Sequence, residues 1–300
     1  MTSPIATDTT SHLGLARFRE EDGRVRVVWR RSGDPQAWAA TVDGNGFDDV
    51  PELLVAADGD VARIDRGSEL YAPDDKLLAV VGRPRKIVCT GQNYLTHVEE
   101  AGREAPPAYP DLFPKWDNAL SAPYAEIALP HESDQIDYET ELAVVIGKRC
   151  RRIPAHAAEQ VVFGYTAAND GSVRDYQFLG SQRLAGKVWD DLTPLGPVIV
   201  PIGELGGTAP DLTITGLFDG TVVQHDRTSN MIFGIPQLIA YLSTLMTLEP
   251  GDVVLTGTPA GVGFVREPQL LLTDGSVFEV RIEGIGSLRN VYRKEPLATK

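Results

Sequence analysis

Two glutamates that lie two positions apart, Glu139 and Glu141, begin a long run of apolar residues that ends near Ile146. In a β-strand, side chains at positions i and i+2 point to the same face, with Cα atoms roughly 6.5 Å apart. The alternate apolar residues then fall on the opposite, buried face. Two carboxylates held side by side near a core repel each other unless water, a proton or a cation compensates them. The pair indicates either a divalent metal site or a solvated strand end.

A third carboxylate, Asp170, ends another strand-like segment and is followed by Gly171 and Ser172. Such a sequence is also typical of a turn or of a helix N-cap. Together with the glutamate pair, however, Asp170 offers a third hard oxygen ligand without histidine or cysteine. That donor set favours Mg²⁺, Mn²⁺ or Ca²⁺ over zinc or copper.

His97 and Glu100 lie three positions apart, so on a helix they share a face. A carboxylate beside an imidazole fixes its tautomer, as the activation of a water molecule requires. A solvated surface pair is the alternative. Lys115 and Lys187 each lie in apolar surroundings and would either neutralise a substrate anion or be solvated.

A glycine-rich segment, from Gly257 to Gly263, follows a strand-like run but lacks the Gly-Lys-Ser/Thr ending of a phosphate-binding loop. Its backbone N–H groups and the Thr258 hydroxyl would suit a carboxylate, although a tight loop between strands has the same composition. No nucleotide-binding fingerprint occurs, and the absence of Gly-x-Ser-x-Gly disfavours a serine hydrolase.

The elements that must position these residues are mostly strands. Short β-rich runs are predicted at 87–90, 139–146, 163–168, 197–201, 212–218, 253–257 and 277–282, and helical periodicity is clear only at 155–162 and 236–246. Because regular strand-helix alternation is missing, we predict a β-rich α+β fold rather than a doubly wound sheet. Residues 1–80, with alternating segments, a helix-like stretch at 48–57 and a polar connection at 65–67, predict a small N-terminal α+β domain before a catalytic domain at 81–300.

The charge balance narrows the class of partner. The 300 residues include 28 Lys and Arg against 42 Asp and Glu, a formal charge of −14. This opposes binding to nucleic acid or to an anionic membrane, and an anionic substrate would need a metal and local cations. Cys89 and Cys150 are predicted to be reduced core residues. Without a secretory pattern or an uninterrupted apolar span, a cytoplasmic protein is expected.

Taken in order, several segments between about residues 80 and 292 resemble the fumarylacetoacetate hydrolase family. They are Gly91-Gln92-Asn93-Tyr94 with His97 and Glu100, the run from Glu139 to Lys148, Gly164-Tyr165-Thr166 through Asp170 to Gln177, Gly186-Lys187, Pro194-Leu195-Gly196-Pro197, and Leu255 to Pro259 ahead of Gly261-Val262-Gly263. Each segment alone is weak, whereas the ordered set is specific. The resemblance is to the acylpyruvase-like and 2-hydroxyhepta-2,4-diene-1,7-dioate isomerase-like branch.

The resemblance implies a mixed β-sandwich roll, commonly a homodimer, with Mg²⁺ or Mn²⁺ bound by Glu139, Glu141 and Asp170. It also implies that His97 and Glu100 form a water-activating pair on a segment that closes over the substrate. Further site residues that it implies are Lys187 beside the metal and, at the substrate, Thr258, Gln177, Lys115 and Tyr94. Departures from the family pattern after Lys187 (Val188-Trp189) and after Lys115 (Trp116-Asp117-Asn118) bear on substrate identity.

The function that follows is a metal-dependent hydrolase. It would cleave the C–C bond of an acylpyruvate or related 2,4-dioxo acid to pyruvate and a carboxylic acid through a metal-bound enolate, with His97 deprotonating the water. An oxaloacetate-type decarboxylase and a 2-hydroxy/2-oxo-dienedioate isomerase would use the same metal site. A non-catalytic metal-binding protein is less favoured, because it would be expected to lack the His97–Glu100 pair.

Overall fold

Strands make up most of the regular structure in the computed structural model, which describes residues 11–102 and 105–295. They are β1 (Gly14–Arg19), β2 (Val25–Arg30), β3 (Gln36–Val42), β4 (Asn45–Gly46), β5 (Asp65–Tyr71), β6 (Leu77–Leu78), β7 (Ile87–Gly91), β8 (Asp111–Lys115), β9 (Leu120–Ser121), β10 (Glu126–Leu129), β11 (Ile136–Asp137), β12 (Thr140–Ile146), β13 (Val162–Asn169), β14 (Ser172–Val173), β15 (Thr193–Pro201), β16 (Thr213–Phe218), β17 (Thr221–Arg227), β18 (Val253–Leu255), β19 (Val277–Ile282) and β20 (Gly286–Lys294).

The helices are fewer and short. The α-helices are α1 (Val50–Ala56), α2 (Leu95–Glu100), α3 (Arg174–Gln177) and α4 (Ile235–Leu245), and the 3₁₀ turns are η1 (Val61–Arg63), η2 (Asp74–Lys76), η3 (Asp117–Ala119), η4 (Ala155–Gln160), η5 (Arg183–Gly186), η6 (Ile202–Glu204) and η7 (Thr228–Asn230). The predicted β-rich α+β class is therefore correct.

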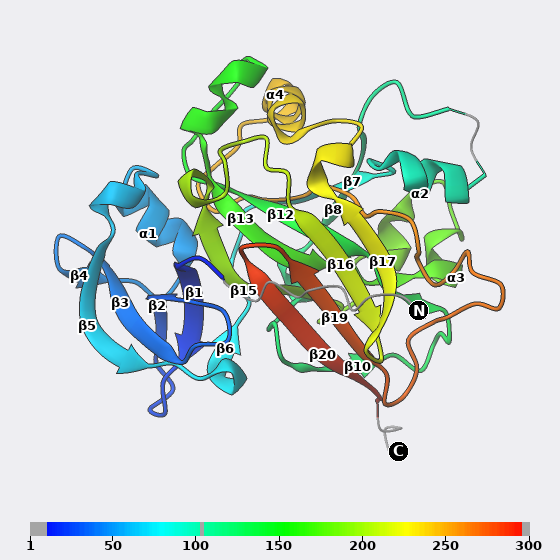
Figure 1. Cartoon of the computed structure of the whole chain (residues 1–300), viewed down its shortest axis with the longest axis horizontal. Coiled ribbons are helices and arrows are strands. Elements are labelled where there is room, and N and C mark those ends of the chain that lie inside the picture. The colour runs from blue at the N-terminus through cyan, green and yellow to red at the C-terminus, as the bar shows by residue number, and fades with distance from the viewer. Residues whose placement is uncertain (1–10, 103–104, 296–300) are drawn as a thin grey trace, which may run out of the picture.

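Two sheets form the body of the molecule. The larger has 13 strands, with the path β4-β3-β2-β1-β15-β13-β12-β18-β7-β8, while β5, β6 and β9 pair beside it. A five-stranded sheet, β10-β20-β19-β16-β17, lies across β12 and β13 (Figure 1). A third pairing, β11 with β14, has only two strands. It lies directly beside the residues that the sequence analysis singles out.

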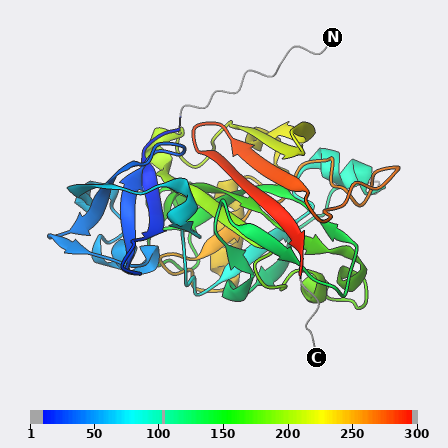
Figure 2. The same ribbon diagram turned by 90° about the horizontal axis from the view of Figure 1, so that it is seen from below.

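Residues 11 to about 80 form a lobe at one end of the molecule, seen in both views (Figures 1 and 2). Its strands join the large sheet through one antiparallel pair, Leu15 with Ile199. Helix α1 begins where the Asp49 side chain accepts a hydrogen bond from the N–H of Val50 at 2.8 Å. The proposed domain boundary near residue 80 falls between β6 and β7, and it remains a proposal.

Strand β12, which begins one residue after Glu139 and contains Glu141, separates two parts of the core. All seven residues of β12 are buried. Leu142, Val144 and Ile146 pack into one apolar cluster with residues of the five-stranded sheet, while Ala143 and Val145 pack into another. The sequence pattern predicts that only one face of this strand is buried. In the structure both faces are buried, because the five-stranded sheet covers one face of β12 and a second apolar cluster covers the other.

Several element-level predictions need correction. The segment predicted as a helix at 155–162 is the 3₁₀ turn η4 instead. It ends at Gln160, because Val162 already belongs to β13. The polar connection predicted at 65–67 is the start of β5, whose residues are almost all exposed and so show no apolar alternation. The mainly polar, exposed strand β17 has no counterpart in the predictions for the same reason.

The prediction that the two cysteines are reduced core residues is confirmed. Cys89 and Cys150 are both buried and unpaired. No helix in the described part of the chain is long and apolar enough to cross a membrane.

Candidate active site

The strand register brings the three acidic residues together. β12 and β13 pair antiparallel, with Thr140 opposite Asn169, so the residues just outside this pair, Glu139 and Asp170, are neighbours. The N–H of Asp170 donates to the carbonyl oxygen of Glu139 at 2.9 Å. Carboxylate oxygens of Glu139, Glu141 and Asp170 all lie within 4.8 Å of one another, and all three residues are buried.

Two buried lysines contact this group of carboxylates. Lys187 Nζ lies 2.8 Å from Oε2 of Glu139 and 2.9 Å from Oδ2 of Asp170. Lys115 Nζ lies 2.7 Å from Oδ1 of Asp170 and also donates to Thr193 Oγ1 at 2.7 Å. Neither lysine is solvated, so the solvated alternative for both is wrong.

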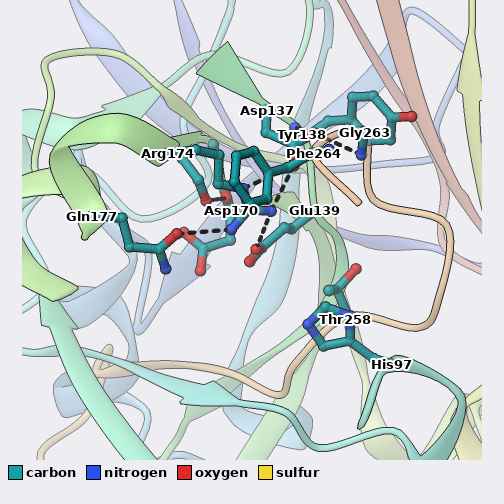
Figure 3. A network of polar contacts seen from close by, with 12 residues as sticks. His97, Asp137, Tyr138, Glu139, Asp170, Arg174, Gln177, Thr258, Gly263 and Phe264 are labelled. Carbon is teal, nitrogen blue, oxygen red and sulfur yellow. Dashed lines mark hydrogen bonds and ion pairs between the residues drawn. The ribbon is translucent and has the colours of Figure 1, made fainter. Parts of the chain in front are cut away.

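An arginine that the sequence analysis gave no role completes the ring of cations. Arg174, the first residue of α3, directs Nη2 to Oε1 of Glu139 at 2.7 Å and Nη1 to Oε1 of Gln177 at 3.0 Å. Its Nε donates to Oδ2 of buried Asp137 at 2.8 Å. Figure 3 shows these contacts converging on the guanidinium. Asp137 lies two positions before Glu139, so the i, i+2 spacing that pointed to the glutamates extends to it as well.

The three acids differ in their electrostatic surroundings. Burial, Asp170 and Glu139 raise the pKa of Glu141 well above its usual value, and the N–H of Gly257, at 2.8 Å, and the charge of Lys187 oppose this without cancelling it. Burial also acts to raise the pKa of Glu139, but Lys187, Arg174 and His97 outweigh it and hold that pKa low. Among the described residues no cation pairs with Glu141, which leaves it as the one uncompensated carboxylate.

A hard divalent cation fits this donor set. The ligand atoms are all carboxylate oxygens, they are within reach of one ion, and the least compensated of them belongs to a fully buried residue. The hydroxyl of Tyr94 is also buried and has no hydrogen-bond partner among the described residues. Burial raises the pKa of Tyr94 first and the nearby charge of Glu141 raises it further, so this hydroxyl is a protonated donor close to the acids.

The predicted histidine–glutamate pair is present on helix α2. His97 Nδ1 and Glu100 Oε1 are 2.6 Å apart, and both side chains are mostly covered, with 13% and 18% exposed. Oε2 of Glu100 accepts a hydrogen bond from the N–H of Gly261 at 2.7 Å. The surface-pair alternative does not hold, because the carboxylate connects the helix to the glycine-rich loop. In Figure 3, His97 approaches from a different segment than the carboxylates do.

Thr258 lies in the site region with its hydroxyl already engaged. Its Oγ1 donates to the carbonyl oxygen of Thr140 at 2.9 Å and accepts from Nε2 of Gln224 at 2.8 Å. Gln224 comes from β17 of the five-stranded sheet and also accepts from the N–H of Thr140 at 2.9 Å. The structure therefore gives the Thr258 hydroxyl a loop-holding role, and its contact with a substrate carboxylate stays a prediction. Gln224 itself carries no sequence signal that distinguishes it from a solvated glutamine.

One cavity, of about 370 Å³, lies away from these residues, where the N-terminal lobe meets the rest of the chain. Its walls carry charges of both signs, from Arg17, Arg19, Arg83, Asp117, Glu126 and Asp191. The mixed charge indicates no single class of ligand, and none of the site residues described above lines this cavity. The chemistry is better argued from the buried acids and cations.

Comparison with known proteins defines the class. Residues 86–293 match the family model described as the C-terminal domain of fumarylacetoacetate (FAA) hydrolase. Solved structures share the fold over nearly the whole chain. A fumarylacetoacetate hydrolase from psychrophilic Exiguobacterium antarcticum superposes with a TM-score of 0.78 at 31% identity, covering 95% of this chain and 100% of the other. A 2-hydroxyhepta-2,4-diene-1,7-dioate isomerase from Mycobacterium marinum gives 0.72 at 31% identity, covering 95% and 99%.

The chain belongs to the fumarylacetoacetate hydrolase family. Among curated relatives, it is 45% identical over 217 residues to the fumarylacetoacetate hydrolase domain-containing protein 2 homolog of Dictyostelium discoideum, covering 69% of this chain and 71% of the relative. It is 42% identical over 215 residues to the human protein named oxaloacetate tautomerase FAHD2A, mitochondrial, covering 71% and 68%. Members of this family with named activities are enzymes that act on small organic acids.

Proposed function

We propose that this protein is a divalent-metal-dependent enzyme that interconverts the enol and keto forms of a small 2-oxo dicarboxylic acid such as oxaloacetate. The observation that carries the proposal is the buried group of three carboxylates edged by three cations, with a histidine–glutamate pair close by. The similarity to relatives named oxaloacetate tautomerase, at 41–42% identity, supports this substrate class. The predicted hydrolase thus becomes the second candidate.

Glu139, Glu141 and Asp170 would hold Mg²⁺ or Mn²⁺, with Ca²⁺ as a further possibility from the donor chemistry alone. The bound ion would supply Lewis-acid polarisation of the 2-oxo group. The cations beside the acids would offset the negative charge of a dicarboxylate, which an enzyme with a formal charge of −14 otherwise repels. Lys187 and Arg174 also keep Glu139 ionised and so ready to bind a cation.

Tautomerisation needs one group that moves a proton to or from carbon. In the enol-to-keto direction, the enol hydroxyl gives up one proton and C3 of the acid gains one. His97 suits the transfer at C3, because Nδ1 is held by Glu100 and the ring leaves Nε2 to carry the proton. We assign the Tyr94 hydroxyl to the substrate oxygen, since it is a protonated donor without a partner among the described residues.

The second candidate is hydrolysis of an acylpyruvate, and the short His97–Glu100 contact of 2.6 Å supports it as well. An imidazole oriented by a carboxylate can deprotonate water as readily as it moves a proton at carbon. The water would attack the distal ketone, the C–C bond would break, and pyruvate and a carboxylic acid would leave. Decarboxylation of oxaloacetate would need the same carboxylates and cations but no base.

The experiment that separates these reactions uses the purified chain, stripped with EDTA and then assayed with and without Mg²⁺ or Mn²⁺. Decay of the ultraviolet absorbance of enol-oxaloacetate is followed, and pyruvate, CO₂ and carboxylic acid are quantified with oxaloacetate, acetylpyruvate and fumarylpyruvate. Metal-dependent loss of the enol without pyruvate supports the tautomerase. Pyruvate with an equal amount of acid would replace it by the hydrolase, and pyruvate with CO₂ by a decarboxylase.

Two further expectations remain proposals. We propose that the protein acts as a homodimer, as the family resemblance implies. We also propose a cytoplasmic location from the sequence, whereas the mammalian relatives with the tautomerase name are described as mitochondrial.

A further inference from the structure

Three carboxylates on three separate segments accept hydrogen bonds from the backbone of one short loop, residues 257–264. Glu141 accepts from the N–H of Gly257 at 2.8 Å. Glu100, the partner of His97, accepts from Gly261 at 2.7 Å. Asp137 accepts from Gly263 at 2.8 Å and from Phe264 at 3.1 Å. The loop therefore connects a metal-ligand candidate, the histidine–glutamate pair and a third acid without an assigned role.

Asp137 divides its two oxygens between the loop and the arginine. Oδ1 accepts from the N–H groups of Tyr138, at 2.9 Å, and Gly263. Oδ2 accepts from Phe264 and from the guanidinium of Arg174, whose Nε and Nη2 are 2.8 Å and 2.7 Å away (Figure 3). The residue is fully buried, so each of these contacts replaces water that the carboxylate has lost.

The loop is fitted closely around this carboxylate. A Cβ atom on Gly263 would lie 2.0 Å from the carbonyl oxygen of Leu270 and 2.6 Å from Oδ1 of Asp137, so only glycine allows the approach. Arg174, which contacts the other oxygen of Asp137, also reaches Oε1 of Glu139. The buried side chain of Asp137 thus lies between the loop backbone and Arg174, the cation that contacts Glu139.

We propose that Asp137 is a positioning residue that couples the placement of the 257–264 loop to the placement of Arg174 beside Glu139. If the loop were displaced, Asp137 would lose two main-chain donors while still buried, and a buried carboxylate with missing partners is costly. The loop and the guanidinium are therefore held in place together. The part of this proposal that concerns substrate rests on the proposed function, in which Arg174 offsets the charge of an anionic acid.

The first test replaces Asp137 by asparagine and uses Asp252→Asn as a matched control. Asp252 is another buried carboxylate with two main-chain donors, Lys86 and Glu249, and one cation, Lys86 Nζ at 2.7 Å, and it has no contact with the site residues.

Asp137→Asn is expected to raise KM for the acid by on the order of 10- to 100-fold, the range for loss of an outer-shell partner, with a smaller change in kcat. Asp252→Asn is expected to lower Tm and leave KM unchanged. A lower Tm with unchanged KM in Asp137→Asn would reduce the residue to a structural role and overturn the proposal.

A second test works without turnover and without the Asp137 variant. Arg174→Lys keeps the charge but loses the forked contact with Asp137. Among the described residues Arg174 makes no hydrogen bond to the loop backbone, so the variant removes no direct contact with the loop. Coupling through Asp137 predicts faster amide hydrogen exchange at Gly263 and Phe264 in this variant, with Gly275 as an unaffected reference glycine. Unchanged exchange at both amides would overturn the coupling. If the wild-type chain turns over no 2-oxo acid, the proposed function fails while this exchange test still decides the coupling.

Discussion

Glu141 differs from its two neighbours because no cation among the described residues pairs with it. Its pKa is raised above the usual 4.5 by burial, Asp170 and Glu139. A carboxylate whose folded pKa exceeds its unfolded pKa binds more protons in the folded state, so its contribution to stability falls as pH rises above about 4.5. In the metal-free chain, ionised Glu141 is therefore a source of instability that a bound cation would remove.

This predicts opposite effects of Glu141→Gln with and without metal. The variant should weaken Mn²⁺ binding by more than the roughly 10- to 100-fold that loss of an outer-shell partner costs. Without metal it should be more stable than the wild type, by an amount that grows with pH above about 4.5. Isothermal titration with Mn²⁺ and urea unfolding in EDTA at several pH values measure the two effects. Glu279→Gln, which removes a carboxylate paired with Arg281 on β19, is the control. Undiminished Mn²⁺ binding would remove Glu141 from the metal site.

His97 is expected to matter for rate rather than for metal binding. His97→Ala should slow turnover by on the order of 10²–10⁴, the usual range for loss of a general base, and should leave Mn²⁺ affinity and Tm close to those of the wild type. The control is His225→Ala, since His225 is exposed and bonded to Thr215 on β16. Unchanged turnover in His97→Ala would refute the assignment of the base.

At the scale of single residues, sequence reasoning found the groups whose type is unusual for their context. Carboxylates at i and i+2 in an apolar run and lysines among apolar residues are such groups, and the structure buries all of them. The sequence pattern predicts no role for Arg174 and Asp137, because a charged residue near a strand end normally meets water. Their burial depends on the pairing of β11 with β14, which joins Asp137 to Ser172 and which no local pattern predicts.

At the scale of elements, one side chain fastens the turn between strand β7 and helix α2 to the residue that follows strand β18. Asn93, fully buried between β7 and α2, donates to the carbonyl oxygens of Thr256 at 2.8 Å and Phe233 at 3.0 Å. Its Oδ1 accepts from the N–H of Phe233 at 2.8 Å. The amide thus fixes the start of the helix that carries His97 against the end of the strand that precedes the glycine-rich loop.

We predict that Asn93→Ala lowers the free energy of unfolding by about 2–4 kcal/mol, because it leaves buried backbone groups without partners. Turnover should fall as well, since the position of helix α2 depends on this amide. Urea unfolding and a steady-state assay measure the two. Asn230→Ala is the comparison, because the exposed Asn230 side chain bonds to Asp226 alone within the described part of the chain, so a change within about 0.5 kcal/mol is expected. Equal losses in both variants would contradict this role for Asn93.

Elements with a buried apolar pattern were predictable, and those without one were not. The runs at 87–90, 163–168 and 277–282 are strands within one or two residues of the predicted bounds. The polar residues 65–67 predict a connection where β5 begins, because nearly all residues of β5 face solvent and show no apolar alternation. The two-residue strands β11 and β14 are too short to show a period, although they hold Asp137 in place.

At the scale of the whole molecule, the core buries tyrosines whose hydroxyls are protonated when folded. Burial raises the pKa of Tyr124 to about 12 and also raises that of Tyr165, which is fully buried with its hydroxyl bonded to the carbonyl oxygen of Gly207 at 2.9 Å. Neither residue belongs to the candidate active site. Their protonation therefore reports on folding alone.

The sign of the pH effect follows from proton counting. Above the unfolded tyrosine pKa of 10.0, the unfolded chain has released the proton of Tyr165 while the folded chain still holds it. Stability is then fully present below pH 10 and falls with rising pH, by about 1.4 kcal/mol per pH unit for each such tyrosine. Lys187, whose pKa is raised by Asp170 and Glu139 against the effect of burial, contributes in the same direction once pH exceeds its unfolded value of 10.5.

The prediction is that urea unfolding of metal-free protein between pH 9 and pH 11 shows a stability that falls more steeply in the wild type than in Tyr165→Phe. The difference in slope should approach about 1.4 kcal/mol per pH unit above pH 10. Tyr71→Phe, at a residue that is 70% exposed, should leave the slope unchanged, because the hydroxyl removed there is not in the core. If Tyr165→Phe and the wild type kept parallel slopes, the tyrosine would be ionising in the folded chain. Water would then reach β13 beneath the 3₁₀ turn η6, and the core that holds Asp170 in register would be more open than the packing around β13 indicates.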